Sequence, residues 1–241
     1  MKQKILYCGD SPIGGASTYL YAVLKKNRYR VTHIAPHQKL PLLVSKSKFN
    51  LIIISDYSKK NITPNCEDQL VRQVRNGTSL LMVGGWASFT GKWGGYRGSQ
   101  IESLLPVTCS KNDDRLNYAS GLMLSVKQQH PIIRGVRWNN PPVICGLNKV
   151  SVSKQSKVVL EAVALKKGKL QKQRRYPLLV TNHDKDFKSA VFTCDFAPHW
   201  CGGLVDWGTR RVRLKASKNA QVEVGDQYIA FISQMTRWLL A

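Results

Sequence analysis

The residues best placed for chemistry follow a short apolar stretch that ends in two glycines. Ser79–Val83 runs directly into Gly84-Gly85-Trp86-Ala87-Ser88. A glycine pair lets the chain turn sharply after a strand, which exposes a side chain and brings backbone N–H groups close to a developing oxyanion. This is the geometry of a nucleophile elbow, in which Ser88 becomes a nucleophile if a base reaches it. We therefore expect Gly84, Gly85, Trp86 and Ser88 to contact a ligand.

A second group of candidates lies after the apolar stretch 190–194. Asp195 and His199 fall on the loop that follows it, with Trp200 next to the histidine. Imidazole titrates near neutral pH and serves as a general base when a carboxylate orients it. Asp195 and His199 are therefore candidate catalytic residues, and His199 and Trp200 are candidate ligand-binding residues. Alternatively, His199 only satisfies a buried loop carbonyl, and the sequence does not decide between the two.

Two further positions are candidates for binding. Asp10 opens a turn with two glycines, residues 10–15, between the first expected strand and its helix. Such a turn offers N–H groups to an anion, although it matches neither a dinucleotide fingerprint nor a Walker motif. Arg97 lies in a long loop rich in glycine and aromatic residues, 86–106. Its aromatic side chains either stack on a sugar or planar ligand or form the core of the loop.

The elements that position these residues alternate between strands and helices. Apolar runs predict buried strands at 4–8, 51–56 and 79–83, and a further strand is expected near 30–34. Amphipathic spacing predicts helices at 16–26 and from Pro64 to about 75. The second half has β-branched runs at 143–152, 158–165, 176–181 and 190–195, with a basic hairpin around 166–169 and a closing helix at 226–240. The pattern predicts a flavodoxin-like α/β fold with a parallel sheet, helices on both faces and an extra antiparallel hairpin in the second half. A short helix at 99–105 completes the assignment.

The composition restricts the classes of protein. The chain has 241 residues, 37 Lys and Arg against 14 Asp and Glu, and a net charge of +23. No run of 18 uncharged apolar residues occurs and no linker is visible, so we expect a single domain, 1–241, that is cytoplasmic and does not enter a membrane. The charge raises the local concentration of anions, which makes nucleic acid or another polyanion a possible partner. The sequence leaves a homo-oligomer open.

The cysteines indicate neither disulfides nor metal. All six are scattered without a CxxC pair, and several lie in apolar runs, where a reduced thiol packs as a small hydrophobic group. Cys194, His199 and Cys201 have no common zinc spacing and lack a fourth ligand. We expect no metal and no cofactor.

Several segments together resemble a known family. They are Gly84–Phe89 with Gly91, Gly94, Arg97 and Leu105–Val107, then His130–Gly135, Pro177–Val180 and Asp195–Trp200. In this order they resemble class I glutamine amidotransferase-like proteins, specifically uncharacterised bacterial members related to the trehalose-utilisation type. The resemblance implies a Cys at the elbow and a His-x-Glu pair later, so that a thiolate attacks the glutamine amide. Here Trp86 occupies the elbow, and Trp200-Cys201 follows His199, so glutamine hydrolysis by that route is not expected.

Three functions follow as hypotheses. The first is an amidotransferase-like protein without the elbow cysteine that binds a small polar or anionic metabolite, such as a sugar-related one, at the carboxyl edge of the sheet. The second is a nucleic-acid or polyanion binder that uses the basic hairpin, 166–175, and the basic run 210–218. The third is a hydrolase that uses Ser88 or an unusual thiol such as Cys201 or Cys8.

Overall fold

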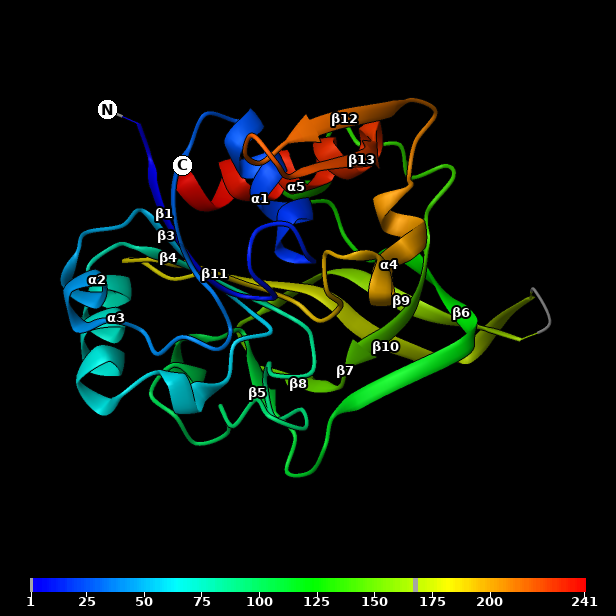
Figure 1. The fold of residues 1–241 in the computed structure, drawn as a ribbon. Coiled ribbons are helices and arrows are strands. Elements are labelled where there is room, and N and C mark those ends of the chain that lie inside the picture. Colours follow the sequence, from blue (N-terminus) through cyan, green and yellow to red (C-terminus); the bar gives the residue numbers. More distant parts are fainter. Residues whose placement is uncertain (1, 167–168) are drawn as a thin grey trace.

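A large mixed sheet organises the chain, as a computed structural model that describes residues 2–166 and 169–241 shows (Figure 1). Its strand order is β2-β1-β3-β4-β11-β10-β9-β6-β7, in which the first five strands are parallel. These are β2 (Arg30–Ile34), β1 (Lys4–Gly9), β3 (Leu51–Ser55), β4 (Ser79–Val83) and β11 (Lys188–Phe192). The expected α/β fold with a flavodoxin-like sheet is confirmed.

An antiparallel extension continues the sheet beyond β11. It consists of β10 (Lys169–His183), β9 (Lys157–Lys166), β6 (Arg115–Val126) and β7 (Val143–Asn148). The basic hairpin predicted from the sequence is formed by β9 and β10. Its tip, 167–168, lies outside the described residues. Two small antiparallel sheets complete the strands: β5 (Val107–Cys109) with β8 (Val150–Val152), and β12 (Arg211–Lys215) with β13 (Gln221–Gly225).

Helices cover both faces of the parallel strands (Figure 1). One face packs against α1 (Ser17–Lys26) and α5 (Asp226–Leu240), and the other against α2 (Leu42–Lys46) and α3 (Pro64–Arg75). Alternate residues of each central strand point to the two faces: Ile53 of β3 joins the core under α1 and α5, and Ile54 joins the core under α3. This is why the central strands are almost wholly apolar in sequence.

Several helix limits follow from local chemistry. The side chain of Thr63 caps α3 by accepting a hydrogen bond from the Cys66 amide, and Pro64 occupies the first helical position. The closing helix runs over the predicted residues, from Asp226 to Leu240. The helix expected at 99–105 is only a 3-10 turn, η2 (Glu102–Leu104). Further short elements are η1 (Lys59–Asn61), η3 (Pro131–Ile133) and α4 (Pro198–Val205).

None of the helices in the described ranges 2–166 and 169–241 is long and apolar enough to cross a membrane.

Candidate functional site

The carboxyl ends of four neighbouring parallel strands bring the candidate residues together. Asp10 follows β1, Asp56 follows β3, the Gly84-Gly85 turn follows β4, and Asp195 lies on the loop after β11. The sheet order reverses between β1 and β3, since β1 connects outward to β2 whereas β3 leads on to β4. Open α/β sheets bind ligands at such a reversal. Asp10 and Asp56 flank it.

Both of these aspartates adopt the left-handed backbone conformation. Asp10 has φ 58° and Asp56 has φ 48°, while Trp86, the expected tip of the elbow, is not in that region. Non-glycine residues rarely adopt positive φ, and such strain clusters at binding and catalytic sites. The strained positions that project side chains from the sheet edge are therefore the two aspartates, and sequence analysis singled out only Asp10.

The carboxyl cluster, which we define as Asp10, Asp56 and Asp195, holds its protons unusually tightly. Burial raises the pKa of Asp10 to about 7; the charge of Asp56 adds to this, and the hydrogen bond donated by the Tyr7 hydroxyl opposes it. Burial, together with the charges of Asp10 and Asp56, raises the pKa of Asp195 well above its usual range. At neutral pH the cluster therefore contains both protonated and ionised carboxyl groups.

Asp56 also anchors the turn that follows β4. Its carboxylate accepts a hydrogen bond from the Ala87 amide. Burial raises the pKa of Asp56, while the Ala87 and Trp86 amides and the His199 imidazole favour the ionised form and lower it. A side chain at Gly85, which has φ 153°, would lie 2.7 Å from Asp56 Cγ, so glycine is required where the two loops meet.

The Gly84-Gly85 turn lies at the sheet edge, as expected, and a second polar pair holds it from the antiparallel half. Asn148 at the end of β7 accepts from the Gly85 amide at 2.9 Å and donates to the Gly85 carbonyl at 3.1 Å. Its amide also donates to Asp114 at 2.7 Å, and Asp114 accepts from the Thr90 and Gly91 amides. Both side chains are fully buried. They rigidify the loop without reaching solvent.

An aromatic platform borders the cluster. The half-buried Trp86 ring lies 5.7 Å from the Trp93 ring and 6.4 Å from the exposed His199 ring, and the Arg115 guanidinium stacks 4.3 Å from its centroid. Trp93 is 50% exposed. His199 is thus brought to the elbow, as the sequence suggested, through its contact with Trp86. Arg115 was missed because its separation from Trp86 in the sequence follows no motif.

The remaining predicted residues lie elsewhere or are already engaged. Ser88 is fully buried; its hydroxyl donates to the Val83 carbonyl at 2.5 Å and accepts from the Asp56 amide at 2.9 Å. Arg97 donates to the Cys109 carbonyl at 2.7 Å, which turns it toward β5. Trp200 lies on α4, is buried, and its indole N–H donates to Asn117 at 2.9 Å. Phe89 and Tyr96 of the loop 86–106 and the more distant Trp207 are also buried. Trp86 and Trp93 are therefore the accessible aromatic residues of this loop.

The cysteines do not supply a thiolate at this edge. Burial raises the pKa of Cys8 and Cys201, and that of Cys194 to about 11, so all three remain thiols at neutral pH. The six cysteines are free. Within the described ranges, no group of three His, Cys, Asp or Glu side chains has the geometry of a metal site.

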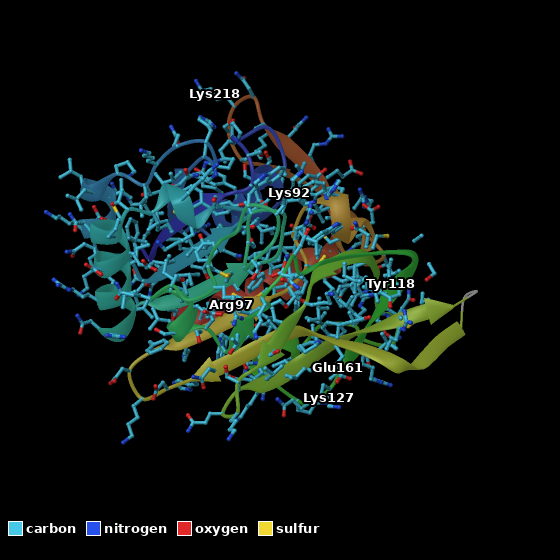
Figure 2. All side chains as sticks on the ribbon, turned by 90° about the horizontal axis from the view of Figure 1, so that it is seen from below. Lys92, Arg97, Tyr118, Lys127, Glu161 and Lys218 are labelled. Carbon is cyan, nitrogen blue, oxygen red and sulfur yellow. The ribbon has the colours of Figure 1, made fainter. Side chains whose placement is uncertain are left out.

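The three arginines of the basic run 210–218 have acidic partners nearby. Arg211 pairs with Asp206 and Glu223, Arg213 with Glu223 at 3.7 Å, and Arg210 with Asp226 at 3.8 Å. Figure 2 shows Lys218 and Lys127 at opposite sides of the molecule. The positive charge is therefore spread over the surface.

Comparison with known proteins agrees with this arrangement. Residues 11–215 match the model of the family described as "Putative glutamine amidotransferase". The chain belongs to this glutamine amidotransferase-like family. No curated protein sequence matches it significantly.

Solved structures share the fold of this family member. The cytoplasmic protein STM3548 of Salmonella typhimurium is similar over 98% of this chain and 98% of its own, with a TM-score of 0.73 and 22% identity. The cytoplasmic protein STM1381 of the same organism is similar over 98% of this chain and 99% of its own, with a TM-score of 0.75 and 20% identity. A ThuA-like protein from Bacteroides uniformis is similar over 98% of this chain and 91% of its own, with a TM-score of 0.57 and 13% identity.

Proposed function

We propose that this amidotransferase-like protein binds a small hydroxyl-rich ligand, of the sugar or polyol class, at the carboxyl edge of its sheet. The observation that carries the proposal is the convergence of Asp10, Asp56 and Asp195 beside the accessible Trp86–Trp93 pair. Ionised carboxylates accept hydrogen bonds from hydroxyl groups, and protonated carboxyl groups donate them. Indole rings offer flat apolar faces to the C–H face of a sugar.

The same cluster disfavours an anionic ligand. A carboxylate or phosphate placed among these side chains meets like charge at each carboxyl group that is ionised, in a partly buried setting, which costs up to several kcal/mol. Arg115 does not offset this, because its guanidinium forms a bidentate pair with Asp113 at 2.9 and 2.5 Å. A neutral polar ligand therefore fits this edge better.

The binding experiment is an ¹⁵N NMR titration with neutral saccharides (glucose, galactose and trehalose). We expect saturable shifts in the amides of residues 84–93. Asp56→Asn should weaken binding by about tenfold or more, because it removes a charge-assisted hydrogen bond. Asp68→Asn, at a partly exposed aspartate on α3 outside the cluster, is the matched control and should leave the affinity unchanged. Saccharide shifts confined to other parts of the molecule would contradict the proposal.

We also expect that the protein does not hydrolyse glutamine by way of a thiolate. An indole occupies the elbow position, and the nearby thiols are buried and protonated. Incubation with glutamine should release no more ammonia than the buffer does. Ammonia release that disappears in Cys201→Ser would show that a thiol acts after all.

A further inference from the structure

A polar cavity lies at the amino edge of the sheet, at the opposite end of the parallel strands from the carboxyl cluster. It has a volume of about 380 Å³, within the range of small-molecule sites, and lies between the starts of β9 and η3, the end of β10 and the end of α5. Its lining includes Lys157, His130, His183 and Trp238. None of the described residues that line it is acidic.

Strand register explains why basic side chains gather there. Lys157 of β9 pairs with Thr181 of β10, and His183 of β10 pairs with Lys188 of β11. Thr181 and His183 are two residues apart and therefore point to the same face. Three strands thus direct Lys157, His183 and Lys188 to the side of the sheet covered by α5.

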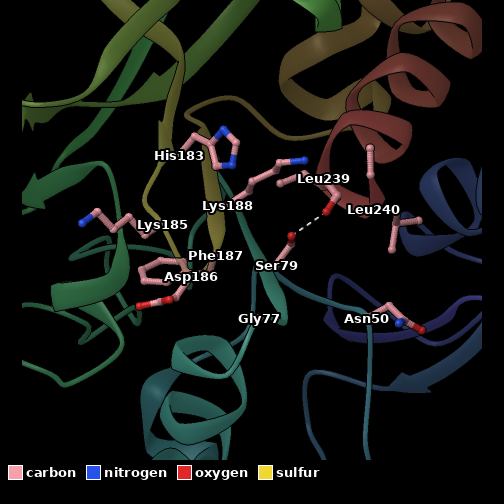
Figure 3. A pocket seen from close by; sticks show the side chains of 11 residues that line it. Asn50, Gly77, Ser79, His183, Lys185, Asp186, Phe187, Lys188, Leu239 and Leu240 are labelled. Atoms are coloured by element: carbon pink, nitrogen blue, oxygen red, sulfur yellow. Dashed lines mark hydrogen bonds between the residues drawn. The ribbon is translucent and has the colours of Figure 1, made fainter.

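Trp238 of α5 holds these groups in place. Its indole meets the His130 ring edge to face at 4.9 Å and the His183 ring at 6.4 Å. The Lys188 ammonium lies 5.6 Å from the indole centroid and donates to the Trp238 carbonyl at 3.1 Å. Figure 3 shows the neighbouring cavity, which shares His183 with this one. Lys188 and Leu239 line that neighbouring cavity, and Asp186 is the acidic side chain among the described residues of its lining.

His130 is set up as a neutral hydrogen-bond donor. Its Nδ1 accepts from the Ile132 amide at 3.3 Å, which assigns the ring proton to Nε2. Burial, with a contribution from the Lys157 charge, lowers the pKa of His130 to about 4. The imidazole therefore offers an N–H beside the Lys157 ammonium, and the Asn182 and Gln155 amides add further donors to the lining.

We propose that this amino-edge cavity binds a phosphate group, as inorganic phosphate or as the phosphate ester of a small metabolite. One ammonium, two imidazoles and side-chain amides match the acceptor oxygens of a phosphate, and the absence of acidic side chains from the described lining removes like-charge repulsion. The inference is independent of the proposed function, because it concerns other residues and another ligand.

The test is an NMR titration at constant ionic strength with inorganic phosphate in one arm and glycerol 3-phosphate in the other. We expect saturable shifts at the Trp238 indole and at the amides of 181–183. Tighter binding of glycerol 3-phosphate supports an ester ligand, and equal or tighter binding of inorganic phosphate supports the free anion. No saturation below about 10 mM in either arm overturns the proposal.

Variants separate this site from the general positive charge. Lys157→Gln should weaken binding about tenfold, because a charge-assisted hydrogen bond is lost. Lys154→Gln removes the same charge from an exposed position outside the cavity and should have less than a twofold effect. Equal weakening by both variants would show that only diffuse charge attracts phosphate. Exposed His183→Gln offers a second variant, and unchanged affinity in both Lys157→Gln and His183→Gln would refute the proposal.

Discussion

The two ends of the same parallel strands present opposite chemistry. At the carboxyl edge, three aspartates and an accessible tryptophan pair gather, and burial makes the carboxyl groups retain protons. At the amino edge, two histidines and two lysines surround Trp238. One sheet therefore carries an acidic and a basic region separated by its apolar core. The net charge of +23 is a sum over the whole chain, so it predicts neither the acidic carboxyl edge nor the local chemistry of the basic amino edge.

The largest expected effect is a loss of stability when the Asn148–Gly85 hydrogen bonds at the carboxyl edge are removed. Asn148→Ala removes both hydrogen bonds to Gly85 and leaves buried polar groups unpaired, so the free energy of unfolding should fall by about 3 kcal/mol. Urea denaturation measures this. The phosphate-induced shift at the Trp238 indole should persist at its wild-type affinity under native conditions, and its loss would show that the two edges are coupled.

The second effect concerns the loss of folding stability caused by ionising the buried Asp10 at the carboxyl edge. Because the pKa of Asp10 is raised in the folded state, the folded protein binds the extra proton, and ionising Asp10 opposes folding as pH rises from about 4 to about 7. Asp10→Asn removes this penalty and should stabilise the protein by about 2 kcal/mol at pH 8.

The gain from Asp10→Asn should shrink to less than about 1 kcal/mol near pH 4, where the folded carboxyl is protonated and the unfolded one, with a pKa of about 3.9, is only about half ionised. Thermal unfolding at pH 4, 6 and 8 provides the measurement. Asp68→Asn, at a partly exposed position on α3, serves as the control and should show no such trend. A gain that grows toward low pH would reverse the sign and contradict the burial of Asp10.

The third effect is a difference between the two edges in how ligand affinity depends on salt concentration. Between 50 and 500 mM NaCl, phosphate affinity at the amino edge should fall about fivefold, because screening weakens its attraction to Lys157. Saccharide affinity at the carboxyl edge should change less than about twofold, since that ligand is neutral. Calorimetric titrations of both ligands across the salt series measure the two slopes, and similar slopes would remove the electrostatic distinction.

The smallest effect is spectroscopic. Since burial and Lys157 lower the pKa of His130, its imidazole should stay neutral between pH 5 and 8 and titrate with a midpoint of about 4. The Cε1–H chemical shift followed against pH reports this directly. A midpoint above 6 would mean that His130 is a cation near neutrality and not a neutral donor.

Sequence patterns predicted the parallel half well because its signals are local. Its central strands β1, β3 and β4 are mainly apolar runs, and Thr63-Pro64 marks a helix start by its own chemistry. The strand β6 was missed because Gly121 and several polar residues interrupt it, and the register shifts between Asn117 and Leu122. Strand β12 was read only as a basic run, although its alternation of basic and apolar residues has the period of a strand.

The candidate site was predictable only in part. Asp10 and the Gly84-Gly85 turn follow apolar strands, and the chain order alone places them at one edge. Asp56 ends a strand in the same way and carried an equivalent signal that was not used. Asn148 and Asp114 contact the loop at sequence separations of 63 and of 23 to 24 residues, and such long-range partners leave no periodic trace in a single sequence.

The Asn148 clamp on Gly85 also has a consequence for the order of events during synthesis. A ribosome must add 63 residues after Gly85 before the side chain that fixes its turn exists, and Asp195 follows still later. The amino-terminal strands can pair early. The loops at their carboxyl ends acquire their final shape only when the second half of the chain, which supplies Asn148 and Asp195, has emerged and folded against them. Closing so long a loop is slow compared with local pairing. A nascent chain halted before residue 148 would therefore lack the side chain that fixes the Gly85 turn, together with β11 and α5, which complete the core on one face of the parallel strands.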